Sequence, residues 1–108
     1  GAFDSGRCSE AETSATITAT LKNAAELLCP HTAVGVKVAE EQRVQGVPMI
    51  TLATAHPAKF PDAVEAASGI RPGLPPHMAD LFERPERVTR LSNDLSALEA
   101  HVREHRRK

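Results

Sequence analysis

Aromatic residues and cysteines are scarce in this sequence. It has three phenylalanines and neither tryptophan nor tyrosine. The core must therefore be built from smaller side chains, which bury less apolar area per residue than aromatic rings do. The two cysteines, Cys8 and Cys29, lack CxxC spacing. We expect free thiols rather than a disulfide, and two cysteines alone do not form a zinc site.

Long apolar runs and a dominant charge are also missing. No stretch approaches the ~18 apolar residues of a membrane span, and no signal peptide is visible, so we expect a soluble, cytoplasmic protein without a membrane partner. The formal net charge is −1 with both signs mixed along the chain, which does not favour binding to nucleic acid. The six glycines are scattered, so the chain has no glycine-rich phosphate loop.

The length of 108 residues fits one domain or less. The chain starts with Gly-Ala and no methionine, and we expect this start to be a tag-cleavage scar or the edge of an excised fragment. We predict a lead-in loop over residues 1–8, a helix–helix–strand–helix unit over residues 9–69, and a C-terminal helical tail over residues 70–108.

Three helices are predicted in the central unit. Ser9 and Glu12 match a capping box, and apolar residues at helical spacing extend this helix over about residues 10–28. A second helix is predicted over residues 30–43, with a proline in its first turn, where the missing amide costs nothing. A third helix over residues 61–68 is followed by a glycine, a common helix terminator.

Residues 47–53 are mostly apolar and β-branched, a pattern typical of a strand buried on both faces in a parallel sheet. The predicted fold class is therefore α/β: a mostly helical fragment with one central strand. A single strand cannot satisfy its own backbone groups, so its neighbours must come from elsewhere. We expect the surface of residues 47–53 to be unusually exposed or to mediate self-association. A compact monomer that covers both strand edges would contradict this prediction.

The tail begins with a proline-rich connector. Residues 76–82 are predicted to form a short helix, and residues 88–91 are predicted to form a short strand. Three apolar side chains of the short helix are expected to face inward: Met78, Leu81 and Phe82.

A last helix is predicted after Asn93 or Asp94, either of which can cap it. The basic run over residues 103–108 would end this helix, where cations suit the helix dipole. Nucleic-acid binding by this run is a disfavoured alternative that predicts strongly salt-dependent affinity. The apolar stripe of the helix consists of Leu95, Leu98 and Val102.

The stretch TLATAHPAKFP, residues 51–61, contains the end of the predicted strand and the polar turn that follows it. In open α/β sheets, ligands bind at the carboxyl ends of strands. This rule makes Thr54, His56 and Lys59 the candidate site residues. For His56 and Lys59 we favour structural or solvated roles over ligand contact.

His31 and Thr32 lie in the first turn of the second predicted helix, where exposed amides can hold an anion. We favour the simpler interpretation that Thr32 caps the helix. His101 and His105 share a helical face but lack the glutamate of an HExxH motif, so we expect no metal site. We also expect no catalytic dyad among the exposed acidic pairs, which are Asp62 with Glu65 and Glu83 with Glu86.

Three stretches carry a resemblance to a known family: LATAHPAKFPDAVEAASG after the predicted strand, CPHTAVGVKVAE at residues 29–40, and ERPER at residues 83–87. Together they resemble the C-terminal end of threonine synthase, a fold type II (β-family) pyridoxal-phosphate enzyme. The resemblance covers about residues 5–103. It implies that residues 1–108 are one C-terminal segment of a larger cofactor-binding enzyme, and that the predicted strand belongs to its parallel sheet.

The resemblance also implies an activity, the conversion of O-phospho-L-homoserine to L-threonine and phosphate with pyridoxal 5'-phosphate as cofactor. In fold type II enzymes a serine or threonine hydroxyl is the partner of the pyridine nitrogen, and Thr54 occupies the matching place. The family's Schiff-base lysine lies in the N-terminal half, so Lys59 is not that residue. The chain alone is then expected to have no catalytic residue and to be inactive without the remainder of the same polypeptide.

The sequence leaves open the role of position 29 and an alternative function. Cys29 stands where many relatives have aspartate before PHTA, which leaves any acidic role at that position in doubt. The alternative function is a free-standing α/β interaction module without a cofactor, for instance a dimer that pairs its orphan strand.

Overall fold

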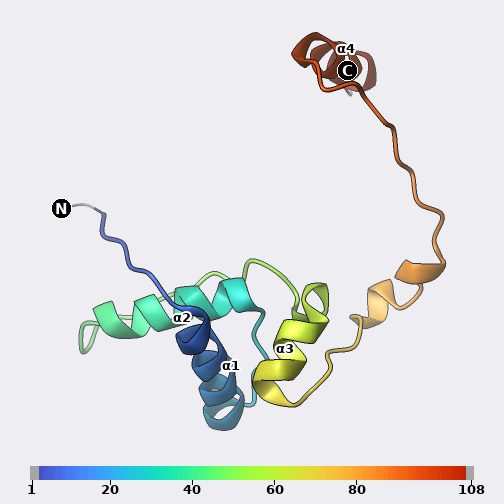
Figure 1. Ribbon diagram of the computed structural model, residues 1–108. Helices are drawn as coiled ribbons and strands as arrows, with labels where there is room; N and C mark the ends of the chain where they lie inside the picture. The colour runs from blue at the N-terminus through green and yellow to red at the C-terminus, as the bar shows by residue number, and fades with distance from the viewer. Residues whose placement is uncertain (1–2, 107–108) are drawn as a thin grey trace.

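Three helices form the body of the molecule in the computed structural model, which describes residues 3–106 (Figure 1). They are α1 (Glu10–Ala24), α2 (Pro30–Gln42) and α3 (Pro61–Ser68). α1 packs against both α2 and α3. The buried apolar core is small and contains no aromatic ring, consistent with the composition; its members are Ile17, Leu28, Cys29, Ala33 and Val64.

The start of α1 is fixed by the predicted capping box. The Ser9 amide donates to Glu12 Oε2 at 2.8 Å, and the Glu12 amide donates to Ser9 Oγ at 3.3 Å. The helix ends at Ala24 rather than near residue 28, because Ala25 adopts a left-handed conformation with φ 55° and its amide donates to the Leu21 carbonyl. The predicted helix was therefore too long at its C-terminal end.

A polar contact joins α1 to α3. The Thr18 hydroxyl donates to the Ala67 carbonyl in the last turn of α3 at 2.6 Å. This bond satisfies one of the carbonyls that a helix C-terminus leaves without an internal partner. Ala67 also packs against the core cluster that contains Ile17, so α3 is fixed against α1.

The predicted central strand is wrong. Residues 3–106 contain no strand, so the described chain is all-helical and the α/β assignment fails. Residues 47–53 instead form an irregular segment that runs back along α2 (Figure 1). At Gly35 the approach is close, since a Cβ there would lie 3.1 Å from Thr51 Cγ2. Strand structure requires a hydrogen-bonded neighbour, and no described part of the chain supplies one.

The exposure expected for this segment is confirmed. Ile50 is 83% exposed and Leu52 is 76% exposed, and the other large apolar residues of the segment, Val47 and Met49, are also exposed. These side chains lie on the surface because the three-helix body has no face that covers them.

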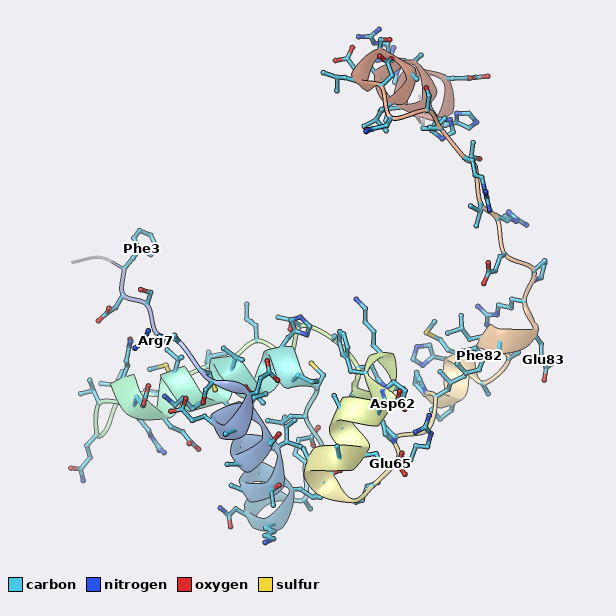
Figure 2. All side chains as sticks on the ribbon, in the orientation of Figure 1. Phe3, Arg7, Asp62, Glu65, Phe82 and Glu83 are labelled. Carbon is cyan, nitrogen blue, oxygen red and sulfur yellow. The ribbon has the colours of Figure 1, made fainter. Side chains whose placement is uncertain are left out.

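The connector after α3 is attached to the body by charge. Arg71 Nη1 lies 3.0 Å from Asp62 Oδ1 and 2.6 Å from Glu65 Oε2. Figure 2 shows these two carboxylates on the side of α3 where the connector leaves the body. Both acids therefore have the same structural partner, the guanidinium of Arg71.

Beyond the connector the chain has little regular structure. The predicted helix over residues 76–82 is replaced by two 3₁₀ turns, η2 (Pro76–Met78) and η3 (Leu81–Glu83), and residues 88–91 are irregular rather than a strand. Phe82 was predicted to face inward, but it is 85% exposed and projects from η3 (Figure 2). The predicted helix, the predicted strand and the inward-facing Phe82 are all wrong, because among residues 3–106 no other element packs closely enough here to bury these side chains.

The last helix, α4 (Leu95–His105), stands apart from the body at the end of a long irregular segment (Figure 1). Asp94 rather than Asn93 caps it, because Asp94 Oδ1 accepts from the Ala97 amide at 2.9 Å. The predicted stripe of Leu95, Leu98 and Val102 is present, but all three side chains are exposed. Gly1 and Ala2 of the predicted lead-in loop, and the last two residues of the basic run, lie outside the described residues.

The molecule is far more open than a globular chain of its length. Its Cα radius of gyration is 18.9 Å, whereas a compact domain of this length has about 13 Å. Its solvent-accessible surface is 9112 Å², against about 5,800 Å² for a compact monomer of its mass. Within residues 3–106, no helix is long and apolar enough to cross a membrane.

Candidate functional site

A cavity of about 370 Å³ opens where the loop between α1 and α2 meets the turn that precedes α3. The loop contributes residues 26–29, the first turn of α2 contributes Thr32, and the turn contributes residues 53–57. Two of the predicted site residues, Thr54 and His56, line this cavity, and Lys59 does not. The fold thus joins segments that are far apart in the sequence into one site.

Cys29, not Thr32, caps α2. Its Sγ accepts from the Thr32 amide at 3.4 Å, and Pro30 follows as the first helical residue. Cys29 is 1% exposed. Burial raises the pKa of its thiol, but hydrogen bonds from the Thr32 side chain and from nearby backbone amides outweigh this, so the pKa lies below its ordinary value. Position 29 is therefore a helix cap rather than an acidic site.

Thr32 has a different role from the predicted cap. It is 5% exposed, and its Oγ1 accepts from the backbone amide of Thr54 at 3.3 Å. The same Oγ1 lies 3.2 Å from Cys29 Sγ. Since Oγ1 already accepts from the Thr54 amide and Sγ accepts from the Thr32 amide, the hydroxyl proton can point at the sulfur. A chain of hydrogen bonds therefore runs from the Thr54 amide through Thr32 to Cys29; its Thr32–Cys29 end is buried and its Thr54 end is partly buried.

His56 and Lys59 shape the turn. His56 Nδ1 accepts from the Ala58 amide at 3.1 Å and so caps the 3₁₀ turn η1 (Pro57–Lys59). Lys59 Nζ lies 5.6 Å from the centre of the Phe60 ring, within the range of a cation–π contact. Both contacts lie within the turn itself.

His31 is not part of the cavity lining and packs on the turn. Its ring centroid lies 4.8 Å from that of Phe60, at an interplanar angle of 41°. This contact joins the first turn of α2 to the start of α3, so the two segments that carry Thr32 and Thr54 are held together on a second side.

Thr54 differs from its neighbours in the cavity because its side chain is exposed. Within residues 3–106, only its backbone amide has a hydrogen-bond partner, and its hydroxyl has none. A neutral hydroxyl on a fixed backbone, open to an incoming group, fits the partner that a pyridine nitrogen of pyridoxal phosphate requires. The cavity has no lysine in its lining, so the described residues offer no covalent attachment for that cofactor here.

No metal centre is found in the described part of the chain, where three or more histidine, cysteine or acidic side chains never gather as ligands would. The rings of His101 and His105 lie 4.1 Å apart on α4, and His105 Nδ1 contacts the His101 carbonyl at 2.9 Å. This pair closes the end of α4 rather than forming part of the cavity.

Comparison with known proteins defines the family. The family model described as "Threonine synthase, C-terminal" matches residues 32–102, which include both Thr32 and Thr54. The chain therefore belongs to the threonine synthase family, as its C-terminal region. The free-standing interaction module has no support from these matches.

The relatives are full enzymes of which this chain matches one part. Threonine synthase from Pseudomonas aeruginosa is 52% identical over 105 residues, a match that covers 95% of this chain and 22% of that protein. Threonine synthase from Corynebacterium glutamicum is 38% identical over 101 residues, covering 93% of this chain and 21% of that protein. The crystal structure of PLP-bound threonine synthase from Brucella melitensis matches with a TM-score of 0.79 at 51% identity, covering 98% of this chain and 23% of that one. The chain thus spans less than a quarter of the length of the relatives it matches.

The sequence did not indicate the bond between Thr32 and Thr54. It joins residues 22 positions apart, and no local pattern reports such a contact. The cap at Cys29 had a usable signal, because a proline at the first helical position makes the residue before it the cap. Thiols are not among the common capping residues, which is why Thr32 was preferred instead.

Proposed function

We propose that the full-length protein to which this chain belongs is a threonine synthase that converts O-phospho-L-homoserine to L-threonine and phosphate with pyridoxal 5'-phosphate. Residues 1–108 form one C-terminal segment of it, and Thr54 is the partner of the pyridine nitrogen. The exposed, unpaired Thr54 hydroxyl at the cavity mouth is the observation that carries this assignment.

The neutral character of the site supports the proposed chemistry. Bound pyridoxal phosphate supplies an electron sink for elimination and replacement reactions. A threonine hydroxyl, unlike a carboxylate, does not hold the ring nitrogen protonated. The cofactor ring therefore withdraws electrons less strongly than it would beside a carboxylate. In this chain, Thr54 binds and orients the ring, while the buried Thr32 hydroxyl holds the Thr54 amide.

The chain has a supporting role in this proposal, because the lysine that holds the cofactor belongs to the rest of the polypeptide. The exposed apolar residues of segment 47–52 and of α4 are the surface on which that remainder packs. The similarity to a region of a larger PLP-bound enzyme over nearly the whole chain supports this arrangement.

The proposal is tested in the full-length protein by the absorbance of the bound cofactor, with wild type, Thr54→Ala and Thr54→Ser. We expect Thr54→Ala to shift the visible band and weaken cofactor binding by about tenfold, because a hydrogen bond to the ring is lost. Thr54→Ser keeps the hydroxyl and should restore most of the wild-type spectrum.

Thr51→Ala is the matched control, since Thr51 lies on the same irregular segment but outside the cavity lining. It should leave the spectrum unchanged. If the full-length protein binds no pyridoxal phosphate, the proposed function is wrong. If it binds the cofactor and Thr54→Ala has the wild-type spectrum, the function stands and the role of Thr54 is wrong.

A further inference from the structure

The buried hydroxyl of Thr32 holds a backbone amide at the edge of the cavity. Thr32 belongs to the first turn of α2 and is 5% exposed, and its Oγ1 accepts the Thr54 amide at 3.3 Å. That amide belongs to the irregular turn, not to a helix, and has no other described partner. Fixing one backbone amide of a turn residue restricts the directions in which its side chain can point.

The acceptor is itself held in place. Thr32 follows Pro30, whose ring fixes the backbone at the helix start. Cys29 Sγ contacts Thr32 Oγ1 at 3.2 Å and accepts the Thr32 amide at 3.4 Å. The turn is therefore tied to the first turn of α2 through the Thr54 amide, and the acceptor of that amide is held from behind by Cys29.

The Thr32 hydroxyl is buried, and its bond to the Thr54 amide is partly buried. Removing one partner of a buried hydrogen bond leaves the other unsatisfied and costs more than the net value of the bond. Thr32 also lies at the centre of a chain of three polar groups, in which each bond polarises the next. The alternative for the Thr54 amide is to turn toward the open cavity, which would carry the Thr54 hydroxyl with it.

We propose that Thr32 is a positioning residue for the cofactor, which aims the Thr54 hydroxyl by holding the Thr54 amide, and that Cys29 supports it from behind. This inference rests on the proposed function, because it assigns a role to the group that positions Thr54. It adds a residue on a different element, and it predicts that α2 and the cofactor are coupled through the Thr54 amide.

The test uses the full-length protein with three variants. Thr32→Val keeps the shape of the side chain and removes the hydroxyl, and Thr32→Ser keeps the hydroxyl. Thr13→Val is the matched control: Thr13 is another buried threonine of the body, its hydroxyl donates to the Ser9 carbonyl at 2.9 Å, and it lies outside the cavity lining.

The first readout needs no cofactor. Deuterium uptake is followed in the apo protein by mass spectrometry, with a peptide that contains Thr54 and a peptide from α1. Loss of the hydrogen bond to Oγ1 should speed exchange of the Thr54 amide about tenfold in Thr32→Val. The α1 peptide should be unchanged, and Thr32→Ser should behave as wild type.

The second readout is the bound cofactor at saturation. We expect Thr32→Val to shift the visible band in the same direction as Thr54→Ala and to raise the dissociation constant about five- to tenfold. Thr13→Val should lower the melting temperature without moving the band. A residue that matters only for folding would behave like Thr13.

The outcomes separate the two proposals. If Thr54→Ala moves the band and Thr32→Val does not, the positioning role is wrong while the proposed function stands. If neither variant moves the band, the roles of both residues are wrong. If Thr32→Val fails to fold, Cys29→Ser replaces it; a wild-type exchange rate for the Thr54 amide in that variant would overturn the supporting role of Cys29.

Discussion

The α1–α3 body and the tail that ends in α4 use the same kinds of local signal but reach different degrees of organisation. Both α1 and α4 begin at an acidic or hydroxyl cap, and both carry an apolar stripe. In α1 the stripe is covered, with Ile17 only 1% exposed, whereas Leu98 at the middle of α4 is 49% exposed. Local capping can start a helix, but only packing against another surface buries its apolar face.

This difference indicates where each region obtains its stability. An isolated helix of 11 residues, the length of α4, is marginal in water because nucleation is costly and few bonds repay it. α1 and α3 instead share buried side chains and the hydrogen bond from Thr18 to Ala67. We therefore expect the body to fold as a unit and the tail to depend on a surface supplied by the rest of the enzyme.

The largest effect should come from truncating the body core. Ile17→Ala removes a fully buried side chain and should lower the free energy of unfolding by about 2–5 kcal/mol, most of the stability of so small a core. Leu98→Ala, the same kind of truncation in α4, should change it by less than about 0.5 kcal/mol in this chain. Urea denaturation followed by far-UV circular dichroism measures both.

The distinction between body and tail is wrong if Ile17→Ala and Leu98→Ala lower the free energy of unfolding of this chain by the same amount. In that case α4 would be packed as tightly as α1. In the full-length protein Leu98→Ala should become costly, since we propose that the remainder of the polypeptide covers this stripe. A Leu98→Ala variant that is neutral in both contexts would leave α4 without a packing partner.

How much could be predicted from sequence follows the same division. The cap at Ser9, the start of α2 and the whole of α3 follow from signals within a few residues, and the sequence located them well. Residues 47–53 have the composition of a buried strand, but strand structure depends on a neighbour, and none is present in the described chain. The failure of the strand prediction and the exposure of Ile50 have the same physical cause: no other part of the described chain pairs with this segment or covers its apolar side chains.

The site was predictable only in part for a similar reason. Thr54 became a candidate through its place after the predicted strand, and its proposed cofactor role came only from the family resemblance, since a lone threonine in a turn is a weak signal. Thr32 was placed correctly at the start of α2 but given the wrong role, because the group that it holds lies 22 residues away. Contacts of this range are set by packing, which a local pattern does not report.

The smallest expected effect is a pH dependence of the body. Hydrogen bonds from the Ser9 side chain and amide, together with Lys37, lower the pKa of Glu12 to about 2 from its usual 4.5. Because the pKa is lower in the folded state, the stabilisation is fully present above about pH 4.5 and is lost as the pH falls toward 2. Acid titration of the melting temperature should show this loss, and Glu12→Gln should reduce it.

Glu99→Gln in α4 is the matched control for Glu12, since within residues 3–106 the ion-pair partner of Glu99 is Arg103, at 2.8 Å on the surface. It should leave the acid transition of the body unchanged. An acid transition that Glu99→Gln alters as much as Glu12→Gln does would show that the body and the tail respond together.

Hydrogen–deuterium exchange in this chain alone and in the full-length protein tests the central comparison most directly. We predict that α1 peptides are protected in both, whereas peptides from α4 and from residues 47–52 exchange freely in the chain and become protected in the full-length protein. Protection of α4 in the monomeric chain equal to that of α1 would contradict the comparison. Free exchange of α4 in the full-length protein would contradict the proposal that the remainder of the enzyme covers it.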